Sequence, residues 1–308
     1  MIKAAIVIVC MNNLRNLFPC LDSIKAYTQI PHEVWVVAYL FSKENLLSLR
    51  KNYPWVVVVE SNEIRGFSEN NNLALKQVKT EYTLVLNDDT LFIDDVLGKL
   101  VHSLENTPEA VVMSPLILNK DGSRQYCGRN PRKWYDYIIG DIGYNLDRRH
   151  TPYVDRKGIF QTYNLMGACF LIRQEYFRSL NFFNEYYFFC PEDIALSTLI
   201  NQRGERCYVD SDVKLVHLGG GTRISPVKMA TLPAARKGGI HFYSQGSFAK
   251  KKILCCFIIF FSFIRMLVFA CKRNRIEYLA QWHSILAVFS HETPKELFIR
   301  FYLKLKKQ

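Results

Sequence analysis

Short segments rich in Val, Ile and Leu alternate with helical segments through the first part of the chain. The β-rich runs predict buried strands at residues 4–10, 34–40, 55–59 and 82–86. Between the first three runs, leucines recur at the spacing of one helix face, and Ser42 is placed to cap the second helix. Strands that alternate with helices form parallel sheets through right-handed crossovers, so the sequence predicts an α/β fold.

The strand predicted at residues 82–86 ends in one amide and two carboxylates, Asn87, Asp88 and Asp89. In an open α/β sheet, ligands bind at the carboxyl ends of the strands. Two carboxylates there suit a hard divalent cation that shares its oxygen ligands with substrate phosphates. A solvated turn that caps the following helix explains the same residues, and the motif alone does not separate the two interpretations.

A polar segment at residues 60–68 precedes another predicted helix. Gly66 permits a tight turn, and Ser68 is predicted as the N-cap. A helix N-terminus beside Arg65 can bind an anion such as a diphosphate. The alternative is an ordinary capped helix with a polar first turn.

Paired acids, Glu192 and Asp193, begin a helix directly after the aromatic segment 182–189. They can complement the helix dipole, or their surroundings can raise a pKa and make one of them a general base. His217 ends a predicted strand and precedes three glycines, which permit close approach of a ligand or loop. Residues 125–162 are predicted to be irregular, either shaping an acceptor site or forming a plain surface loop.

Positive charge is concentrated at the end of the chain. Residues 246–308 hold 12 Lys and Arg against 3 Asp and Glu, a net charge of +9 within a total of +12. We therefore divide the chain into a body at residues 1–245 and a basic, apolar helical extension at residues 246–308.

The nine cysteines lack zinc-ligand spacing, and the N-terminal apolar run is too short for a signal peptide. Reduced thiols and a cytoplasmic location are expected.

The extension contains an almost wholly apolar stretch, residues 253–271, with basic residues on both flanks. A membrane span needs about 20 apolar residues, and Arg265 would cost about 3 kcal/mol at the bilayer centre. Residues 293–296 form a capping box that starts a second amphipathic helix. We predict in-plane association with the inner face of the membrane. Packing on the body and a true span are the alternatives, and no nucleic-acid motif accompanies the basic residues.

Several of these motifs occur together in a specific order: the first strand with residues 10–13, then residues 65–72, 86–90, 167–169 and 183–193, and His217 with its glycines. This ordered set resembles glycosyltransferase family 2, and looks most like the rhamnosyltransferase-like branch of bacterial cell-surface polysaccharide synthesis. The resemblance implies the GT-A fold, a Rossmann-like, mainly parallel sheet flanked by helices. It also implies an inverting, metal-assisted, non-processive enzyme. Such an enzyme moves one hexosyl or deoxyhexosyl group from a nucleotide-diphosphate sugar to a hydroxyl of a glycan or lipid-linked acceptor.

The same resemblance implies roles for individual residues. Asp89, with Asp88 and His217, would hold Mg²⁺ or Mn²⁺ on the donor diphosphate. Asp193 would deprotonate the acceptor hydroxyl, with Glu192 beside it. The implied donor-binding residues are Asn12, Arg65, Gly66, Asn71, Asn72, Asn87, Asp88 and Gly167.

Two positions depart from the family pattern. Residues 37–40 lack the Asp with which many members contact the nucleotide base, and Ala195 stands where members often carry a further Asp. These changes keep open a non-catalytic sugar-nucleotide or glycan-binding protein on the same fold. The Gln-x-x-Arg-Trp motif of processive synthases is absent from the sequence, which favours transfer of a single sugar.

Overall fold

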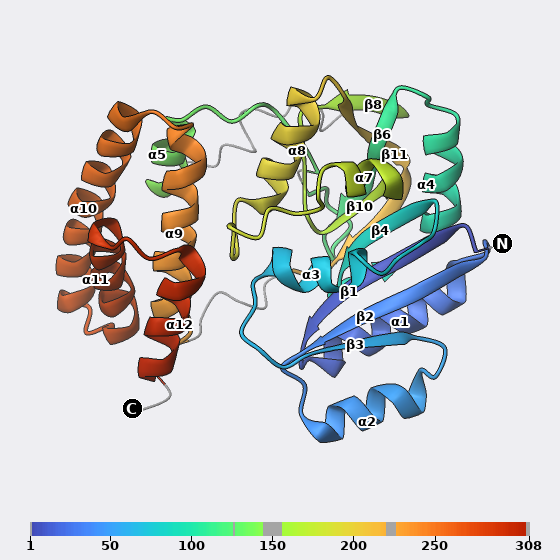
Figure 1. Cartoon of the computed structure of the whole chain (residues 1–308), viewed down its shortest axis with the longest axis horizontal. Helices are drawn as coiled ribbons and strands as arrows, with labels where there is room; N and C mark the ends of the chain where they lie inside the picture. The colour runs from blue at the N-terminus through green and yellow to red at the C-terminus, as the bar shows by residue number, and fades with distance from the viewer. Residues whose placement is uncertain (1, 126, 144–155, 220–225, 306–308) are drawn as a thin grey trace.

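A nine-stranded mixed sheet organises the larger part of the molecule (Figure 1). The computed structural model describes residues 2–125, 127–143, 156–219 and 226–305. Four neighbouring strands are parallel and follow the order β3-β2-β1-β4: β1 (Ala4–Met11), β2 (His32–Tyr39), β3 (Val57–Ser61) and β4 (Tyr82–Asn87). The predicted α/β class and its parallel strands are confirmed.

The other half of the sheet mixes directions. Antiparallel β10 (Cys169–Arg173) lies between β4 and β6 (Ala110–Leu118), and β11 (Arg206–His217) runs parallel to β6. The short strands β5 (Thr90–Phe92) and β8 (Ile159–Thr162) pair antiparallel with β11, while β7 (Gly128–Arg129) and β9 (Asn164–Leu165) form a separate ribbon. Strand β11 has an irregularity in its pairing with β6 between Asp210 and Lys214, and His217 ends the strand as predicted.

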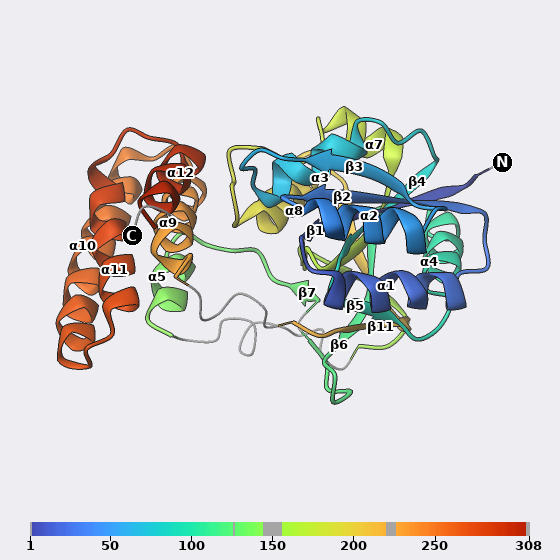
Figure 2. The same cartoon turned by 90° about the horizontal axis from the view of Figure 1, so that it is seen from below.

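Helices cover both faces of the sheet (Figures 1 and 2). They are α1 (Leu14–Tyr27), α2 (Lys43–Asn52), α3 (Phe67–Leu75), α4 (Val96–Glu105), α7 (Gln174–Ser179) and α8 (Glu192–Gln202). The short helix α5 (Asp136–Asp141) lies apart from the sheet, beside the C-terminal helices (Figures 1 and 2). The predicted cap of α2 is confirmed, because Ser42 Oγ accepts from Asn45 N–H at 3.2 Å. Asp95 caps α4, and its Oδ1 accepts from Gly98 N–H at 3.0 Å.

The start of α3 differs from the prediction. Gly66, not Ser68, is the N-cap, and the Glu69 side chain accepts from Gly66 N–H at 3.2 Å. The Phe67 N–H donates to the Phe188 carbonyl at 3.0 Å, and a Cβ at Gly66 would lie only 2.1 Å from that oxygen. The close approach of a distant loop, which the local sequence does not reveal, therefore sets where this helix begins.

Four long helices form a separate layer beside the sheet (Figures 1 and 2). We call them the C-terminal helical unit: α9 (Lys228–Ser244), α10 (Phe248–Cys271), α11 (Arg275–Phe289) and α12 (Pro294–Leu305). The predicted capping box is confirmed, with Thr293 N–H donating to Glu296 Oε2 at 2.8 Å and Glu296 N–H donating to Thr293 Oγ1 at 3.3 Å. The predicted division after residue 245 stays a prediction. Helix α9 comes before that division in the sequence, yet it packs against α10, α11 and α12, which come after it.

Candidate active site

Asp88 and Asp89 form the turn between β4 and β5, at the carboxyl end of a central strand. Backbone bonds hold this turn: Asn87 N–H donates to the Ala168 carbonyl, and Leu218 N–H donates to the Asp89 carbonyl, both at 2.9 Å. Burial is the main cause that raises the pKa of Asp88 to about 6, and the charge of Asp89 adds to it. A carboxyl of this kind ionises readily when a cation is beside it.

His217 faces Asp89 because β5 and β11 pair, with His217 opposite Thr90. His217 Nε2 and Asp89 Oδ1 are 3.2 Å apart, and only 15% and 18% of the two side chains are exposed. Gln125 fixes the ring, since its Nε2 donates to the carbonyl of His217 and to Asn119 Oδ1, both at 2.8 Å. Its Oε1 then accepts from His217 Nδ1–H at 2.9 Å, which leaves Nε2 as the ring nitrogen that faces Asp89.

This arrangement fits a divalent cation. A carboxylate oxygen and an imidazole nitrogen lie 3.2 Å apart, and a cation beside them could take both as neighbouring ligands. Within the described parts of the chain, neither Asp88 nor any other His, Cys, Asp or Glu completes a group of three around them. The protein would supply part of the coordination sphere, as is usual where substrate phosphates complete it.

Asp193 lies at the start of α8 with both carboxylate oxygens held. Oδ1 accepts from Ile194 N–H at 2.8 Å, and Oδ2 lies 3.3 Å from Gly167 N and 3.4 Å from Arg129 Nη1. A Cβ at Gly167 would lie 3.3 Å from the Asp193 Cβ, a tight contact. The residue after Gly167 accepts the hydrogen bond from Asn87, so residues 167–168 join Asp193 to the acidic turn.

Glu192 has a different environment from its neighbour. Its Oε2 atom is buried, and no hydrogen-bond partner for it occurs among the described residues. Burial, with the charge of Asp193 second, raises the pKa of Glu192 well above its ordinary value. The environment therefore favours the neutral form of Glu192 and gives the two adjacent acids different properties.

Arg65 lies in the loop before α3. Its guanidinium is held by Glu63 Oε2 at 2.6 Å and by Ser61 Oγ at 3.2 Å, and 21% of its side chain is exposed. The first two amide groups of the adjoining helix region, those of Gly66 and Phe67, are already bonded within the protein. Arg65 is thus the part of this loop that is best placed to meet an anion.

Asn71 and Asn72 are each only 1% exposed. Asn72 binds the loop that leads to α8: its Nδ2 donates to the Phe183 carbonyl and to Glu185 Oε1, both at 2.9 Å, and its Oδ1 accepts from Phe183 N–H at 3.2 Å. Asn71 Nδ2 donates to the Phe67 carbonyl at 2.9 Å. These contacts give the two amides a positioning role, while the direct donor contact predicted for them stays a prediction.

Asn12 closes the other side of the site. Its Oδ1 accepts from Ser42 N–H at 3.0 Å and from Asn45 Nδ2 at 2.9 Å, which ties the end of β1 to the start of α2. At the end of β2, where the expected base-binding Asp is missing, Tyr39 supplies a hydroxyl that accepts from Arg65 N–H at 3.3 Å. Asn12 therefore joins the end of β1 to α2, and Tyr39 joins the end of β2 to the Arg65 loop.

Sequence reasoning missed two residues of the site, Gln125 and Arg129. Both lie in the segment predicted to be irregular, where only the excess of Arg hinted at a function. Residues 126 and 144–155 of that segment lie outside the described residues, as do Gly220 and Gly221 after His217. The described part of the segment therefore contributes Gln125, which contacts His217, and Arg129, which contacts Asp193.

A cavity of about 1140 Å³ lies away from these carboxylates. It is lined by one face of α8, including Ala195, Leu199 and Gln202, and by the start of α10 at Phe248. At 100° per residue these three α8 positions lie roughly 180–240° around the helix from Asp193. The cavity therefore lies on the side of α8 that faces away from Asp193.

Comparisons with known proteins show the family to which the chain belongs. A family model described as glycosyl transferase family 2 matches residues 5–180. Over 233 residues the chain is 25% identical to the O-antigen biosynthesis protein RfbC of Myxococcus xanthus, a match that covers 72% of this chain and 18% of RfbC. The chain thus spans about a fifth of the length of that curated relative.

Three solved structures share the fold. They are GalNAc-T7 with UDP, GalNAc and Mn²⁺ (TM-score 0.59, 15% identity, 74% of this chain and 46% of that one), the mannosyltransferase PcManGT of Pyrobaculum calidifontis with GDP-Man and Mn²⁺ (0.53, 16%, 99% and 81%), and S. aureus TarS 1-349 (0.54, 17%, 96% and 82%). At these identities the likeness shows the architecture alone.

Proposed function

Because the chain belongs to glycosyl transferase family 2 and has the predicted GT-A fold, we propose that it is an inverting, non-processive glycosyltransferase. It moves one hexosyl or deoxyhexosyl group from a nucleotide-diphosphate sugar to a glycan or lipid-linked acceptor in cell-surface polysaccharide synthesis. The relative that acts in O-antigen biosynthesis supports the polysaccharide setting, and the rhamnosyltransferase-like branch remains our more specific proposal.

The contact between Asp89 and His217 carries the proposal. Two acceptors that face each other at 3.2 Å, at the ends of β-strands, are suited to Mg²⁺ or Mn²⁺. When bound there, the cation would neutralise charge that develops on the leaving diphosphate. Gln125 keeps the ring of His217 in the tautomer that such a site needs, and Asp88 adds a carboxyl that a cation can ionise. Asn87 anchors the turn.

Asp193 is the proposed general base. Contacts from Gly167, Arg129 and Ile194 fix its carboxylate next to the segment that anchors the acidic turn. A positioned carboxylate takes the proton from the acceptor hydroxyl as the hydroxyl attacks the sugar, and a single displacement inverts the anomeric centre. Glu192, whose environment favours the neutral form, is suited to support the start of α8 rather than to accept that proton.

A donor screen tests the function. We expect one nucleotide sugar to be hydrolysed slowly to free sugar and nucleoside diphosphate by the wild-type protein with Mn²⁺ or Mg²⁺, and to stabilise it against heat. Chelator should abolish the reaction. Binding of a donor without release of nucleoside diphosphate, in every metal and with every acceptor supplied, would instead identify a sugar-nucleotide-binding protein.

We also propose that the protein works as a peripheral protein on the inner face of the membrane. Large apolar side chains on one arc of α10 are 40–60% exposed: Ile253, Phe260, Phe263, Ile264, Leu267 and Val268. Soluble monomers rarely expose a continuous apolar surface of this kind. Basic residues at both ends of the helix, Lys250 to Lys252 and Lys272 with Arg273, suit anionic lipid headgroups.

The opposite face of α10 supports an in-plane arrangement. Among the described helices, α10 alone is long and apolar enough to cross a membrane. Its inner face nevertheless carries Ser262 and Arg265, which bind Arg236 of α9 and Asp141 of α5, with Arg265 Nη1 at 2.6 Å from Asp141 Oδ2. A span would bring these charged partners into the hydrocarbon, whereas in-plane docking leaves them within the protein.

A further inference from the structure

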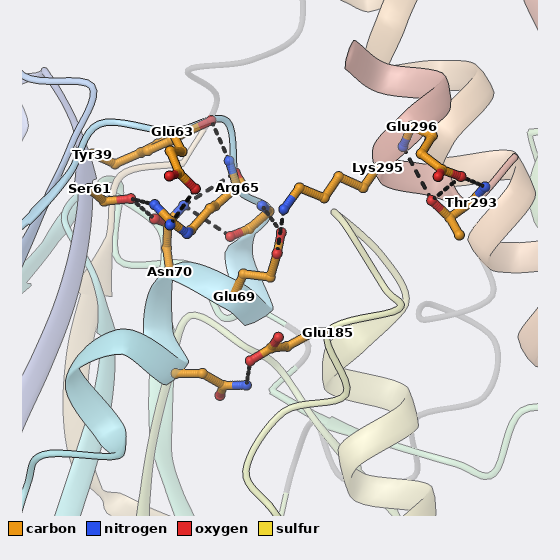
Figure 3. A network of polar contacts seen from close by, with 12 residues as sticks. Tyr39, Ser61, Glu63, Arg65, Glu69, Asn70, Glu185, Thr293, Lys295 and Glu296 are labelled. Atoms are coloured by element: carbon orange, nitrogen blue, oxygen red, sulfur yellow. Dashed lines mark hydrogen bonds and ion pairs between the residues drawn. The ribbon is translucent and has the colours of Figure 1, made fainter. Parts of the chain in front are cut away.

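The last helix of the chain, α12, contacts the candidate active site at two places. Figure 3 shows the first: Lys295 reaches from α12 to Glu69 on α3, across 226 positions of sequence. The second is an aromatic cluster in which Phe298 packs on Phe188 and Phe189, immediately before the acids of α8. The first contact adjoins the Arg65 loop, and the second adjoins Asp193.

The side chain of Glu69 connects Lys295 to the Arg65 loop. Lys295 Nζ lies 2.6 Å from Glu69 Oε1, while Glu69 Oε2 accepts from Gly66 N–H at 3.2 Å. Only 14% of the Glu69 side chain is exposed. Both oxygens of this carboxylate are therefore engaged, one by α12 and one by the residue that follows Arg65.

The loop is held from its other side by the sheet. Asn70 Nδ2 donates to the carbonyls of Arg65 and Gly66 at 3.2 and 3.0 Å, and Asn70 Oδ1 accepts from Ser61 Oγ at 2.7 Å (Figure 3). The sheet thus fixes the body of the loop through Asn70. Lys295 is the contribution of the C-terminal helical unit to the same loop, through Glu69.

The aromatic contact involves the segment that leads to Asp193. The rings of Phe188 and Phe298 lie 4.8 Å apart, and Phe188 is 1% exposed. The Phe188 carbonyl accepts from Phe67 N–H, so this segment and the start of α3 share one packing unit. Leu297 and Phe301 of α12 belong to the same buried cluster.

We propose that α12 positions the donor site of the transferase, with Lys295 and Phe298 as positioning residues. The inference rests on the proposed function. Lys295 holds the carboxylate that braces the Arg65 loop, and Phe298 holds the segment that leads to Asp193. Loss of either contact loosens the region that meets the donor diphosphate, while the sheet and the acidic turn are unchanged.

A purely stabilising role and a positioning role for Lys295 predict different results when this side chain is changed. A partly exposed ion pair contributes at most about 1 kcal/mol to folding, so its loss changes the melting temperature little. Loss of a brace on the Arg65 loop would instead raise the donor KM more than it lowers kcat, because the groups that carry out the chemistry stay in place. Local opening of residues 63–72 would also become more frequent, which hydrogen exchange measures.

The test compares full-length Lys295→Met with Lys304→Met, the same change at an exposed lysine of the same helix. We expect Lys295→Met to raise the donor KM roughly 3- to 10-fold and to speed amide exchange at residues 63–72, with Lys304→Met unchanged. Lys295→Arg should restore both readouts. Glu69→Gln should reproduce the effect, and adding Lys295→Met to it should change little, because one contact is lost in both.

For the second contact, Phe298→Leu keeps an apolar side chain in the cluster and removes the ring packing. We expect faster exchange at residues 183–193 in this variant and not in Lys304→Met. Unchanged exchange and unchanged KM in Lys295→Met and Phe298→Leu would overturn the inference. If wild type turns over no donor, the proposed function fails, and the exchange measurements alone then decide whether α12 braces the two segments.

Discussion

The exposed face of α10 gives the sharpest prediction about where the protein works. Phe260 and Leu267 are seven positions apart, on the same side of the helix, and are 60% and 54% exposed. The double variant Phe260→Gln/Leu267→Gln removes the centre of the apolar face. Because both side chains are largely exposed, the change should alter the free energy of unfolding by no more than about 0.5 kcal/mol each.

The expected loss of membrane binding follows from these exposures. Full burial of a Phe or Leu side chain contributes about 1.5–3 kcal/mol, so docking of the exposed parts of both would contribute about 2–3 kcal/mol. That corresponds to a partition coefficient about 30- to 150-fold lower in the variant. The matched control, Leu47→Gln/Ile93→Gln, changes two exposed apolar residues on the sheet domain and should bind as wild type does.

Flotation with vesicles of phosphatidylglycerol and phosphatidylethanolamine measures this partition. Vesicles of phosphatidylcholine alone should bind less well, since each basic residue near an anionic surface contributes about 1 kcal/mol. Equal flotation of wild type and the α10 variant would refute the reasoning. If the face instead binds a second copy of the chain, wild type would sediment as a dimer, the variant as a monomer, and neither would float.

Four further predictions concern the carboxylates. Asp89→Asn should nearly abolish metal-dependent donor hydrolysis, and full activity of wild type in chelator would show that no cation is needed. Asp193→Asn should keep binding of nucleoside diphosphate with Mn²⁺ but lower transfer by ~10²–10⁴-fold, and near wild-type transfer would exclude it as the base. Glu192→Gln should transfer sugar at a rate close to wild type, and loss of transfer in this variant alone would reverse the assignment. Burial raises the pKa of Glu192 above 4.5, so the wild-type fold loses stability as pH rises through and above that value. The glutamine variant has no group that titrates there, so its unfolding free energy should rise relative to that of wild type as pH increases. A difference between the two proteins that stays constant from pH 4 to 9 would contradict this prediction.

The parallel half of the sheet was predictable because its signals are local. Strands β1, β2 and β4 each contain a largely apolar, β-rich run, and the acids that follow β4 mark its carboxyl end in the sequence itself. The antiparallel half depends on which distant strands pair. Nothing in residues 90–92 indicates a strand, yet its pairing with β11 is what brings His217 to Asp89.

The C-terminal helical unit shows why the rest was hidden. Helix α9 contains Pro233, Gly238 and Gly239, residues that weaken a helix, and sequence analysis did not assign it. In the structure a Cβ at Gly238 would lie 2.8 Å from the Cys190 carbonyl, and one at Gly239 would lie 2.4 Å from the Tyr137 ring. The glycines permit close tertiary packing that outweighs their helix propensity, and a window of local sequence cannot report such packing.

The place of α10 also constrains the acceptor. In both views α9 and α12 lie between α10 and the sheet domain (Figures 1 and 2). Packed helices are 8–10 Å apart, so in-plane docking of the outer face of α10 would hold Asp193 roughly 20 Å from the membrane surface. A lipid-linked acceptor must then carry its reactive hydroxyl across that distance on the sugars attached to its lipid. We therefore expect transfer to improve as the glycan on a lipid-linked acceptor is lengthened from one sugar, until the hydroxyl reaches Asp193. The α10 variant, released from the membrane, should show no such dependence on acceptor length.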